Sequence, residues 1–103
     1  MCKRGVRIES YYVYCHTNKI NNKKYIGITR QIPKRRWDSG HGYKNNRYFC
    51  SAIKKNGWNN FNHEILFEGL SQEDAKRKEI ELIASLNTTD REIGYNITKG
   101  GES

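Results

Sequence analysis

The sequence lacks any long apolar run. None of its 103 residues belongs to a stretch near the roughly 20 consecutive apolar residues that a membrane helix needs. The opening segment MCKRGVRIES carries basic charge without the apolar region of a secretory signal. We therefore expect no membrane association and an intracellular, cytoplasmic protein. No linker, repeat or low-complexity segment interrupts the chain, so we expect one domain over residues 1–103, with its core at about 11–101.

Cysteine is scarce and shows no pairing in its spacing. Cys2, Cys15 and Cys50 are an odd number at unrelated intervals, which argues against a disulfide framework and fits a reducing compartment. Cys15 and His16 are adjacent, so on a strand their side chains would point to opposite faces. Structural zinc needs ligands that converge from paired positions. The sequence therefore predicts free thiols and no zinc site.

Acidic residues are also few, 11 against 19 lysines and arginines, which gives a formal net charge of +8. Between Lys3 and Lys55 only Glu9 and Asp38 are acidic, and the remaining acids begin at Glu64. Positive charge gathered on the first half of the chain favours a polyanionic partner, although an ordinary solvated surface would carry the same charge. Nucleic acid is the partner that we expect on this ground.

Periodicity and turn signals predict an α+β fold. Two segments rich in tyrosine, valine and isoleucine, Tyr11–His16 and Lys24–Thr29, flank a polar turn and predict a β-hairpin. Proline and glycine signals bound two short helices, one over about 33–39 and one within RYFCSAIKKNG, and NFNHEILFEG predicts a third strand. A final helix begins at Ser71 and ends at about Leu86. The order is ββααβα, a small three-stranded antiparallel sheet flanked by helices.

One residue of the last helix breaks its apolar pattern. At about 100° per residue, Glu79 lies near the centre of an apolar stripe made of Ala75, Leu82, Ile83 and Leu86. A carboxylate on a buried face must be paired, protonated or bound to a cation, because an unpaired ion there costs several kcal/mol. A salt bridge to one of the arginines and a metal site both account for this position.

Several short motifs follow one another in a characteristic order. YVY ends at Tyr14, and YIG begins at Tyr25, eleven residues later. Further on come RRW at Arg35–Trp37, AIKKNGWNNF at Ala52–Phe61, EIELI at Glu79–Ile83 and GYNITKGG at Gly94–Gly101. Together these motifs resemble the GIY-YIG nuclease superfamily, and within it the catalytic domains of phage and homing-type endonucleases. The first motif departs from the family name, since Tyr12 stands where the family often has glycine.

The resemblance implies a set of site residues. It places the family's two tyrosines, catalytic arginine, metal-binding glutamate and asparagine on Tyr14, Tyr25, Arg36, Glu79 and Asn96, respectively. Arg36 is preferred to its neighbour Arg35 because it directly precedes Trp37, as the family's arginine commonly precedes an aromatic residue. Tyr11 and Tyr12 are then packing or surface rings.

A second departure follows that arginine. The family's helix often carries a histidine or tyrosine one turn further on, where this chain has Gly40. His41 and Tyr43 are both near enough to replace it, and the segment GHGY is predicted to be a loop, which fixes neither. We place His41 in the site first, because the unperturbed pKa of a histidine, about 6.5, suits proton transfer.

The other two histidines receive structural interpretations. His63 alternates in phase with Phe61, Ile65 and Phe67 along the third predicted strand, so we expect its ring in the core. His16 is predicted to be a surface residue, and neither histidine is assigned to the site.

The resemblance implies a DNA endonuclease that depends on Mg²⁺, or on Mn²⁺, and leaves 5′-phosphate and 3′-hydroxyl ends. Glu79 would hold the metal, since Mg²⁺ binds through one or two carboxylates plus phosphate oxygens. Arg36 would contact phosphate through two nitrogens, and Tyr14 would orient or deprotonate the attacking water. The alternative is a catalytically inactive module of the same fold that binds nucleic acid.

Surface basic residues complete the expectation. The residues assigned to DNA contact are Arg35, Lys44, Lys54 and Lys55. No zinc finger or helix-turn-helix pattern accompanies them, so we expect sequence specificity that is weak, carried by loops or supplied by a separate partner. The sequence leaves open whether the protein nicks as a monomer or cuts both strands as a transient homodimer.

Overall fold

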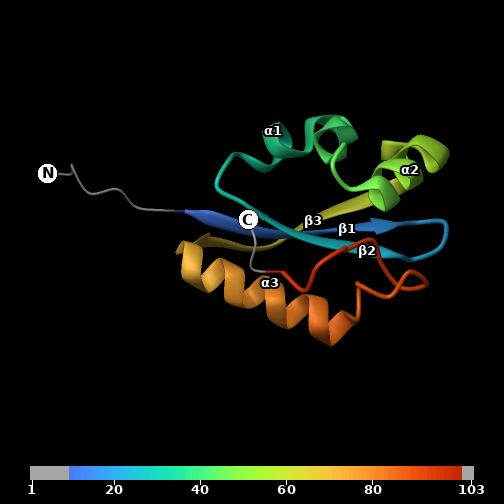
Figure 1. Cartoon of the computed structure of the whole chain (residues 1–103). Helices are drawn as coiled ribbons and strands as arrows, with labels where there is room; N and C mark the ends of the chain where they lie inside the picture. Colours follow the sequence, from blue (N-terminus) through green and yellow to red (C-terminus); the bar gives the residue numbers. More distant parts are fainter. Residues whose placement is uncertain (1–9, 101–103) are drawn as a thin grey trace, which may run out of the picture.

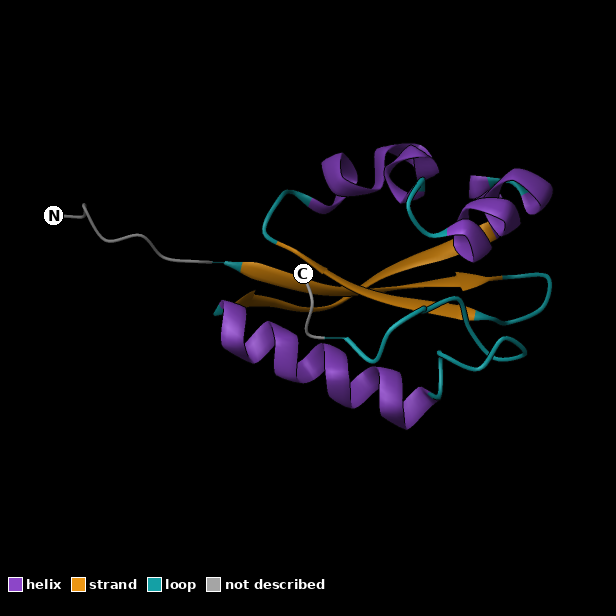
Figure 2. Cartoon of the chain, viewed as in Figure 1, coloured by secondary structure: helices purple, strands orange, loops and turns teal. Residues whose placement is uncertain are grey.

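The computed structural model describes residues 10–100, and the order of its elements is the predicted one (Figures 1 and 2). The strands β1 (Tyr11–Asn18), β2 (Lys24–Thr29) and β3 (Phe61–Leu70) form one antiparallel sheet in the order β2-β1-β3. The helices are α1 (Pro33–Trp37), α2 (Arg47–Asn56) and α3 (Gln72–Leu86), with 3₁₀ segments η1 (Asp38–Tyr43) and η2 (Trp58–Asn60). The predicted α+β fold is therefore confirmed. Cys2, both limits predicted for the domain and the C-terminal limit predicted for its core lie outside the described residues.

The sheet separates two layers of helices (Figure 1). On one face α3 packs against β1 and β2. The buried residues at this contact form the α3 cluster, made of Tyr11, Val13, Cys15, Ile26, Ile28, Ala75 and Ile83. The other face carries α1, η1 and α2 over the aromatic cluster, made of Tyr14, Trp37, Tyr43, Phe49, Phe61 and Tyr95. Because the side chains of a strand alternate between faces, Cys15 enters the first cluster while its neighbours Tyr14 and His16 face the second. The central strand β1 is thus buried on both sides.

Local capping fixes the ends of the longest helix. The Ser71 hydroxyl accepts a hydrogen bond from the backbone N–H of Asp74 at 3.1 Å, as the predicted N-terminal signal requires. At the other end Asn87 adopts a left-handed conformation (φ 57°) that stops the helix after Leu86. No helix within residues 10–100 is both long and apolar enough to cross a bilayer.

The prediction that His16 lies on the surface is wrong. Its ring is 0% exposed and lies within the aromatic cluster, with ring centroids 4.8 Å from Trp37 and 5.6 Å from Phe49. The cause is the sheet itself, because α1, η1 and α2 cover the face of β1 on which His16 lies. A polar side chain in a tyrosine-rich strand therefore became an interior residue.

The burial predicted for the apolar residues of β3 is found only at the start of the strand. Phe61 is buried, but Ile65 and Phe67, expected on the same buried face, are 47% and 38% exposed. Ile65 lies opposite Tyr14 in the same register that places Phe61 opposite Asn18, so it keeps the predicted phase, and its exposure follows from its place on an edge strand. The register shifts only beyond Ile65, on both sides of Val13, where two extra residues are accommodated on β3. Leu66, the next residue, points to the opposite face of the sheet and packs against the α3 cluster.

The segment that follows α3 runs along the outer edge of β2 (Figure 2). The backbone N–H of Lys24 donates to the Ile93 carbonyl at 3.1 Å, and the N–H of Tyr95 donates to the Lys24 carbonyl at 2.9 Å. An edge strand otherwise leaves its outward N–H and C=O groups unpaired. This pairing covers the edge and brings residues 96–100 beside β2. Tyr95, predicted to hold this segment to the body of the protein, is buried in the aromatic cluster.

Gly27, the glycine of the YIG motif, allows a close crossing of side chain and backbone. It pairs with Tyr14 across the β1–β2 ladder, and a Cβ at position 27 would lie 2.6 Å from both Cζ and the hydroxyl oxygen of Tyr14. No real side-chain contact is that short. The Tyr14 ring therefore lies directly on the backbone of the edge strand.

We predict that Gly27→Ala destabilises the domain by about 1–3 kcal/mol and displaces the Tyr14 ring, because the added methyl group overpacks a filled space. Urea unfolding followed by tyrosine and tryptophan fluorescence measures the loss. The control is Gly69→Ala, where nothing lies within 4 Å of the added carbon and only the positive φ of 72° is strained. That variant should lose about 1 kcal/mol. Equal unfolding midpoints for the parent and Gly27→Ala would contradict the close crossing.

Candidate active site

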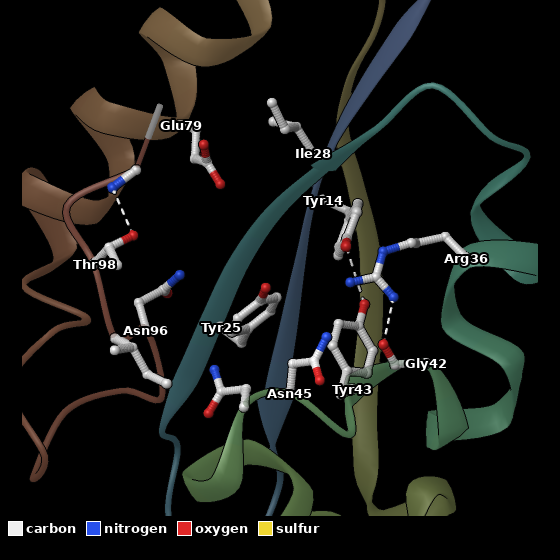
Figure 3. A pocket seen from close by; sticks show the side chains of 13 residues that line it. Tyr14, Tyr25, Ile28, Arg36, Gly42, Tyr43, Asn45, Glu79, Asn96 and Thr98 are labelled. Atoms are coloured by element: carbon white, nitrogen blue, oxygen red, sulfur yellow. Dashed lines mark hydrogen bonds between the residues drawn. The ribbon is translucent and has the colours of Figure 1, made fainter. Parts of the chain in front are cut away.

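A cavity of about 510 Å³ opens at the β2 edge of the sheet (Figure 3). Residues of both layers line it, and they include Tyr14, Tyr25, Arg36, Tyr43, Asn45, Glu79, Asn96, Thr98 and Gly100. The sheet contributes the first two tyrosines, and the segment around η1 contributes Arg36 and Tyr43. Glu79 comes from α3 on the opposite face. Because β2 is an edge strand, groups from the two faces can meet around it without crossing the sheet.

Five of the six residues expected in the site line this cavity, and His41 does not. His41 is exposed, and its Nδ1 donates to the Asp38 carbonyl at 2.9 Å. The preceding residues Ser39 and Gly40 both have positive φ, 51° and 94°, so the chain turns sharply after α1. This turn directs His41 outward and Tyr43 inward. The order in which we ranked the two residues is therefore corrected.

Tyr43 links the two sides of the cavity wall. Its ring is 2% exposed, and its hydroxyl donates to the Tyr14 hydroxyl at 3.0 Å. The Arg36 guanidinium lies over the same ring, 4.6 Å from its centroid. Arg36 is held further by Gly42, whose carbonyl accepts a hydrogen bond from Nη1 at 2.6 Å. Two contacts thus orient the arginine before any ligand binds.

The tyrosines of the cavity are neutral phenols at neutral pH. Burial raises the pKa of Tyr14, and the hydrogen bond from Tyr43 and the charge of Arg36 oppose this rise only in part. Burial likewise raises the pKa of Tyr25 and of Tyr43. A tyrosinate is therefore not present in advance, and any reaction at Tyr14 must start from its protonated form.

Glu79 is the one carboxylate among the described residues that line the cavity. It is 9% exposed and follows the buried residue Ala75 by one helical turn, as the stripe on α3 predicts. Figure 3 shows its carboxylate directed into the space in front of Tyr25, on the side opposite Arg36. Gly100 packs against it, since a Cβ there would lie 3.3 Å from the Glu79 Cγ.

The donor set fits a hard divalent cation that also binds substrate. Among residues 10–100, no group of three or more histidines, cysteines or acids is placed to hold a metal ion by itself. Mg²⁺ does not need such a group, because it commonly takes one or two carboxylates and fills its other positions with water and phosphate oxygens. A single carboxylate facing an open cavity beside an arginine matches this mode of binding. Cys15 and Cys50 are free thiols outside the cavity.

The side chain of Asn96 is hydrogen-bonded to the backbone of β2. Its Oδ1 accepts from the Ile26 N–H and its Nδ2 donates to the Ile26 carbonyl, both at 2.9 Å. The amide therefore acts as one more residue of a strand and extends the backbone pairing at Lys24. Asn96 thereby positions the segment that carries Thr98 and Gly100 against the cavity.

The basic residues that we assigned to DNA contact lie elsewhere on the surface. Arg35, Lys44, Lys54 and Lys55 are all exposed, and none lines the cavity of Glu79. Lys55 lines a second cavity of about 300 Å³ together with Lys23 and Arg91, which no motif in the sequence singled out. Lys44 and Lys54 line a third cavity. Contact of these residues with DNA stays a prediction.

The fold and the cavity together define a GIY-YIG catalytic domain. The family model with that description matches residues 10–96, and the chain therefore belongs to the GIY-YIG family. It is similar to the putative endonuclease segE of Enterobacteria phage T4, with 37% identity over 92 residues. That match covers 88% of this chain and 42% of the phage protein, so the chain spans less than half of its relative's length.

A solved structure shows the same architecture. The catalytic domain of the intron endonuclease I-TevI, in a mutant form, superposes with a TM-score of 0.74 at 25% sequence identity. The match covers 91% of this chain and 99% of that domain. The shared fold therefore includes the sheet, the two helical layers and the edge at which the cavity opens.

We predict that Asn96→Ala lowers the free energy of unfolding by about 2 kcal/mol or more, because two buried backbone groups of Ile26 lose their partner. Chemical unfolding measures the loss, and hydrogen exchange at the Ile26 amide should accelerate selectively. Asn45→Ala is the matched control, since Asn45 is an exposed asparagine on the same cavity. If both variants unfold alike, Asn96 does not hold the segment to β2.

Proposed function

We propose that this domain is a metal-dependent endonuclease that hydrolyses DNA phosphodiester bonds and leaves 5′-phosphate and 3′-hydroxyl ends. The observation that carries the proposal is the meeting of one arginine, one carboxylate and three tyrosines in a single cavity. The formal charge of +8 suits a polyanionic substrate. Both similar proteins are named as endonucleases, which supports the same reaction here.

Arg36 supplies the contact to phosphate in this proposal. Its planar guanidinium can bind two phosphate oxygens at once, a geometry that lysine does not reproduce. Nη1 of Arg36 donates to the Gly42 carbonyl, and the guanidinium plane lies over the Tyr43 ring. The remaining N–H groups of the guanidinium are therefore oriented before phosphate binds. Donors fixed in this way stabilise the charge that develops on phosphate in the transition state.

Glu79 is the residue that would hold Mg²⁺, or Mn²⁺ in its place. When bound, such a metal supplies positive charge at the phosphate and favours departure of the 3′ oxygen. Glu79 and Arg36 approach the cavity from opposite sides (Figure 3). A phosphate between them would therefore meet the charge of the metal on one side and the guanidinium on the other. The position of Glu79 on a buried turn of α3, packed against Gly100, fixes the carboxylate in the cavity.

Tyr14 is the residue that would orient the attacking water. Its ring lies on the backbone of Gly27, and its hydroxyl is held at 3.0 Å from the Tyr43 hydroxyl. A hydroxyl fixed at both the ring and the oxygen can position water with little loss of entropy in the reaction step. Tyr25 borders the same space and limits where that water can lie.

The second candidate function is a nucleic-acid-binding module without catalysis. The basic charge favours both functions equally, because phosphate contacts alone produce non-specific binding. Glu79 favours the enzyme, since a carboxylate in the phosphate cavity repels DNA unless a cation lies between them. A transient homodimer and a separate specificity partner are both compatible with this domain.

We predict that Glu79→Gln abolishes cleavage at any practical Mg²⁺ concentration while DNA binding stays equal or becomes tighter. The substitution keeps the shape of the side chain and removes the charge that binds the metal. Supercoiled-plasmid nicking with Mg²⁺ or EDTA measures cleavage, and Mn²⁺ titration followed by electron paramagnetic resonance measures metal binding directly. Glu73→Gln and Glu81→Gln, on exposed positions of the same helix, are the matched controls. An active, metal-binding Glu79→Gln would refute the proposed metal site.

We predict that Arg36→Lys lowers the cleavage rate by about 10²-fold or more with near-normal DNA binding, the usual scale for loss of a transition-state donor. The charge is kept and the planar fork is lost. Arg35→Lys, at the exposed neighbouring position, should cleave like the parent. The reverse result, with only Arg35→Lys impaired, would show that the other arginine contacts phosphate.

A further inference from the structure

A continuous chain of hydrogen bonds leads from the cavity into the aromatic cluster. The Tyr14 hydroxyl lies 3.0 Å from the Tyr43 hydroxyl, which lies 2.9 Å from Nε2 of His16. On the far side of the His16 ring, Nδ1 lies 2.9 Å from Nδ1 of His63. Every link is within ordinary hydrogen-bonding distance. The four side chains come from β1, η1 and β3 and connect the cavity at the β2 edge with the β3 edge.

The interior of this chain is closed to solvent, and its far end is not. Tyr14, His16 and Tyr43 are 1%, 0% and 2% exposed, whereas His63 is only partly buried. Aromatic rings surround His16, with the Trp58 centroid at 5.0 Å in addition to Trp37 and Phe49. A polar ring in such a place is costly unless both nitrogens are hydrogen-bonded. An apolar side chain would fill the same space without this requirement.

The proposed hydrolysis needs an acceptor for a proton of the attacking water. Burial raises the pKa of Tyr14, so a tyrosinate is not available for this task. Burial and the neighbouring His63 and Arg36 lower the pKa of His16 to about 2, so His16 is neutral. A neutral imidazole has one N–H and one accepting nitrogen, and a hydroxyl also donates and accepts. Each interior member of the chain can therefore receive one proton while it gives up another.

We propose that Tyr43, His16 and His63 form a proton relay that carries charge from Tyr14 to solvent as water attacks the phosphate. The inference rests on the proposed nuclease activity. As an O–H bond of the water breaks, its proton bonds to the Tyr14 oxygen and the original Tyr14 proton passes to Tyr43. The Tyr43 proton passes to Nε2 of His16, and the proton on Nδ1 of His16 passes to Nδ1 of His63. His63 then releases a proton from its other nitrogen to solvent.

The relay balances at each atom, and it starts from the hydrogen-bond direction opposite to the one in the structure. Tyr14, Tyr43 and His16 each gain one proton and lose one, so none of them becomes charged in the net reaction. In the structure Tyr43 donates to Tyr14, so both hydroxyls must first rotate until Tyr14 donates to Tyr43 and Tyr43 donates to Nε2 of His16. The transfer then restores the direction found in the structure. Burial and the positive charge of Lys19 disfavour a proton on His63, and a hydrogen bond to the backbone of Trp58 favours it. His63 can therefore hold the arriving proton briefly and release it.

Single-turnover DNA cleavage by His16→Phe tests the interior of the relay. Phenylalanine keeps a ring of similar size in the aromatic cluster and removes both nitrogens, so we expect cleavage about 10²-fold slower with unchanged DNA binding. Two controls should cleave near the parental rate: Phe49→Leu, which disturbs the same packing, and His41→Ala, which removes a histidine outside the cavity. A parent that does not cleave would reject the nuclease function itself. An active parent with an equally fast His16→Phe would reject the relay.

Chemical rescue tests the solvent end. His63→Ala should slow cleavage about 10-fold, because bulk water reaches this position and replaces the imidazole only in part. Added imidazole should restore the rate, and pyrazole, which has the same shape and is a far weaker base, should not. Ile65→Ala, at an exposed position on the same strand, should respond to neither compound. Unchanged cleavage by His63→Ala, or equal rescue by the two compounds, would show that His63 only fills space and would overturn the relay.

Discussion

The crossing of the Tyr14 ring over the backbone of Gly27 is the contact on which the rest of the site depends. Glycine permits it because any Cβ at that position would overlap the ring. The crossing brings a hydroxyl from the central strand β1 to the edge strand β2, where Tyr43 can bond to it. The same edge carries the pairing of Asn96 with Ile26 on its outer side. Both sets of contacts share β2, and the cavity between the two helical layers opens at this strand.

Several polar side chains are buried next to the cavity of the site. The aromatic cluster contains a fully buried histidine and tyrosine hydroxyls, and each of these groups has a hydrogen-bond partner. An apolar cluster of the same volume would be simpler to stabilise, because hydrogen bonds made on folding replace those already made to water. The hydrogen-bonded chain from Tyr14 to His63 is therefore expected to add little to the free energy of unfolding. Its value lies in connecting the cavity with the partly exposed edge at β3, which is the basis of the proposed relay.

Local signals were sufficient for the regular elements and for one site residue. The hairpin, the cap at Ser71 and the helix to Leu86 follow from side-chain period and end chemistry, which act within a few residues. Glu79 was recognisable because a helix of 3.6 residues per turn places it between Ala75 and Ile83, whatever the helix packs against. The positions of Arg36 and Tyr25 in the cavity depended on the family motif, since neither residue departs from its local pattern.

The amino-acid sequence by itself determined the order of strands and helices and the burial of Ala75 and Ile83 on α3 with the acid between them, because these follow from contacts between near neighbours. Leu86, at the end of the predicted stripe, is 37% exposed. Tertiary structure alone decided which histidine is buried. The face of β1 that carries His16 became interior only when α1, η1 and α2 packed over it. It also decided between His41 and Tyr43, through the positive φ angles of Ser39 and Gly40. A turn of two residues set by packing directs one side chain to solvent and the other into the cavity, and no periodicity in the sequence encodes that choice.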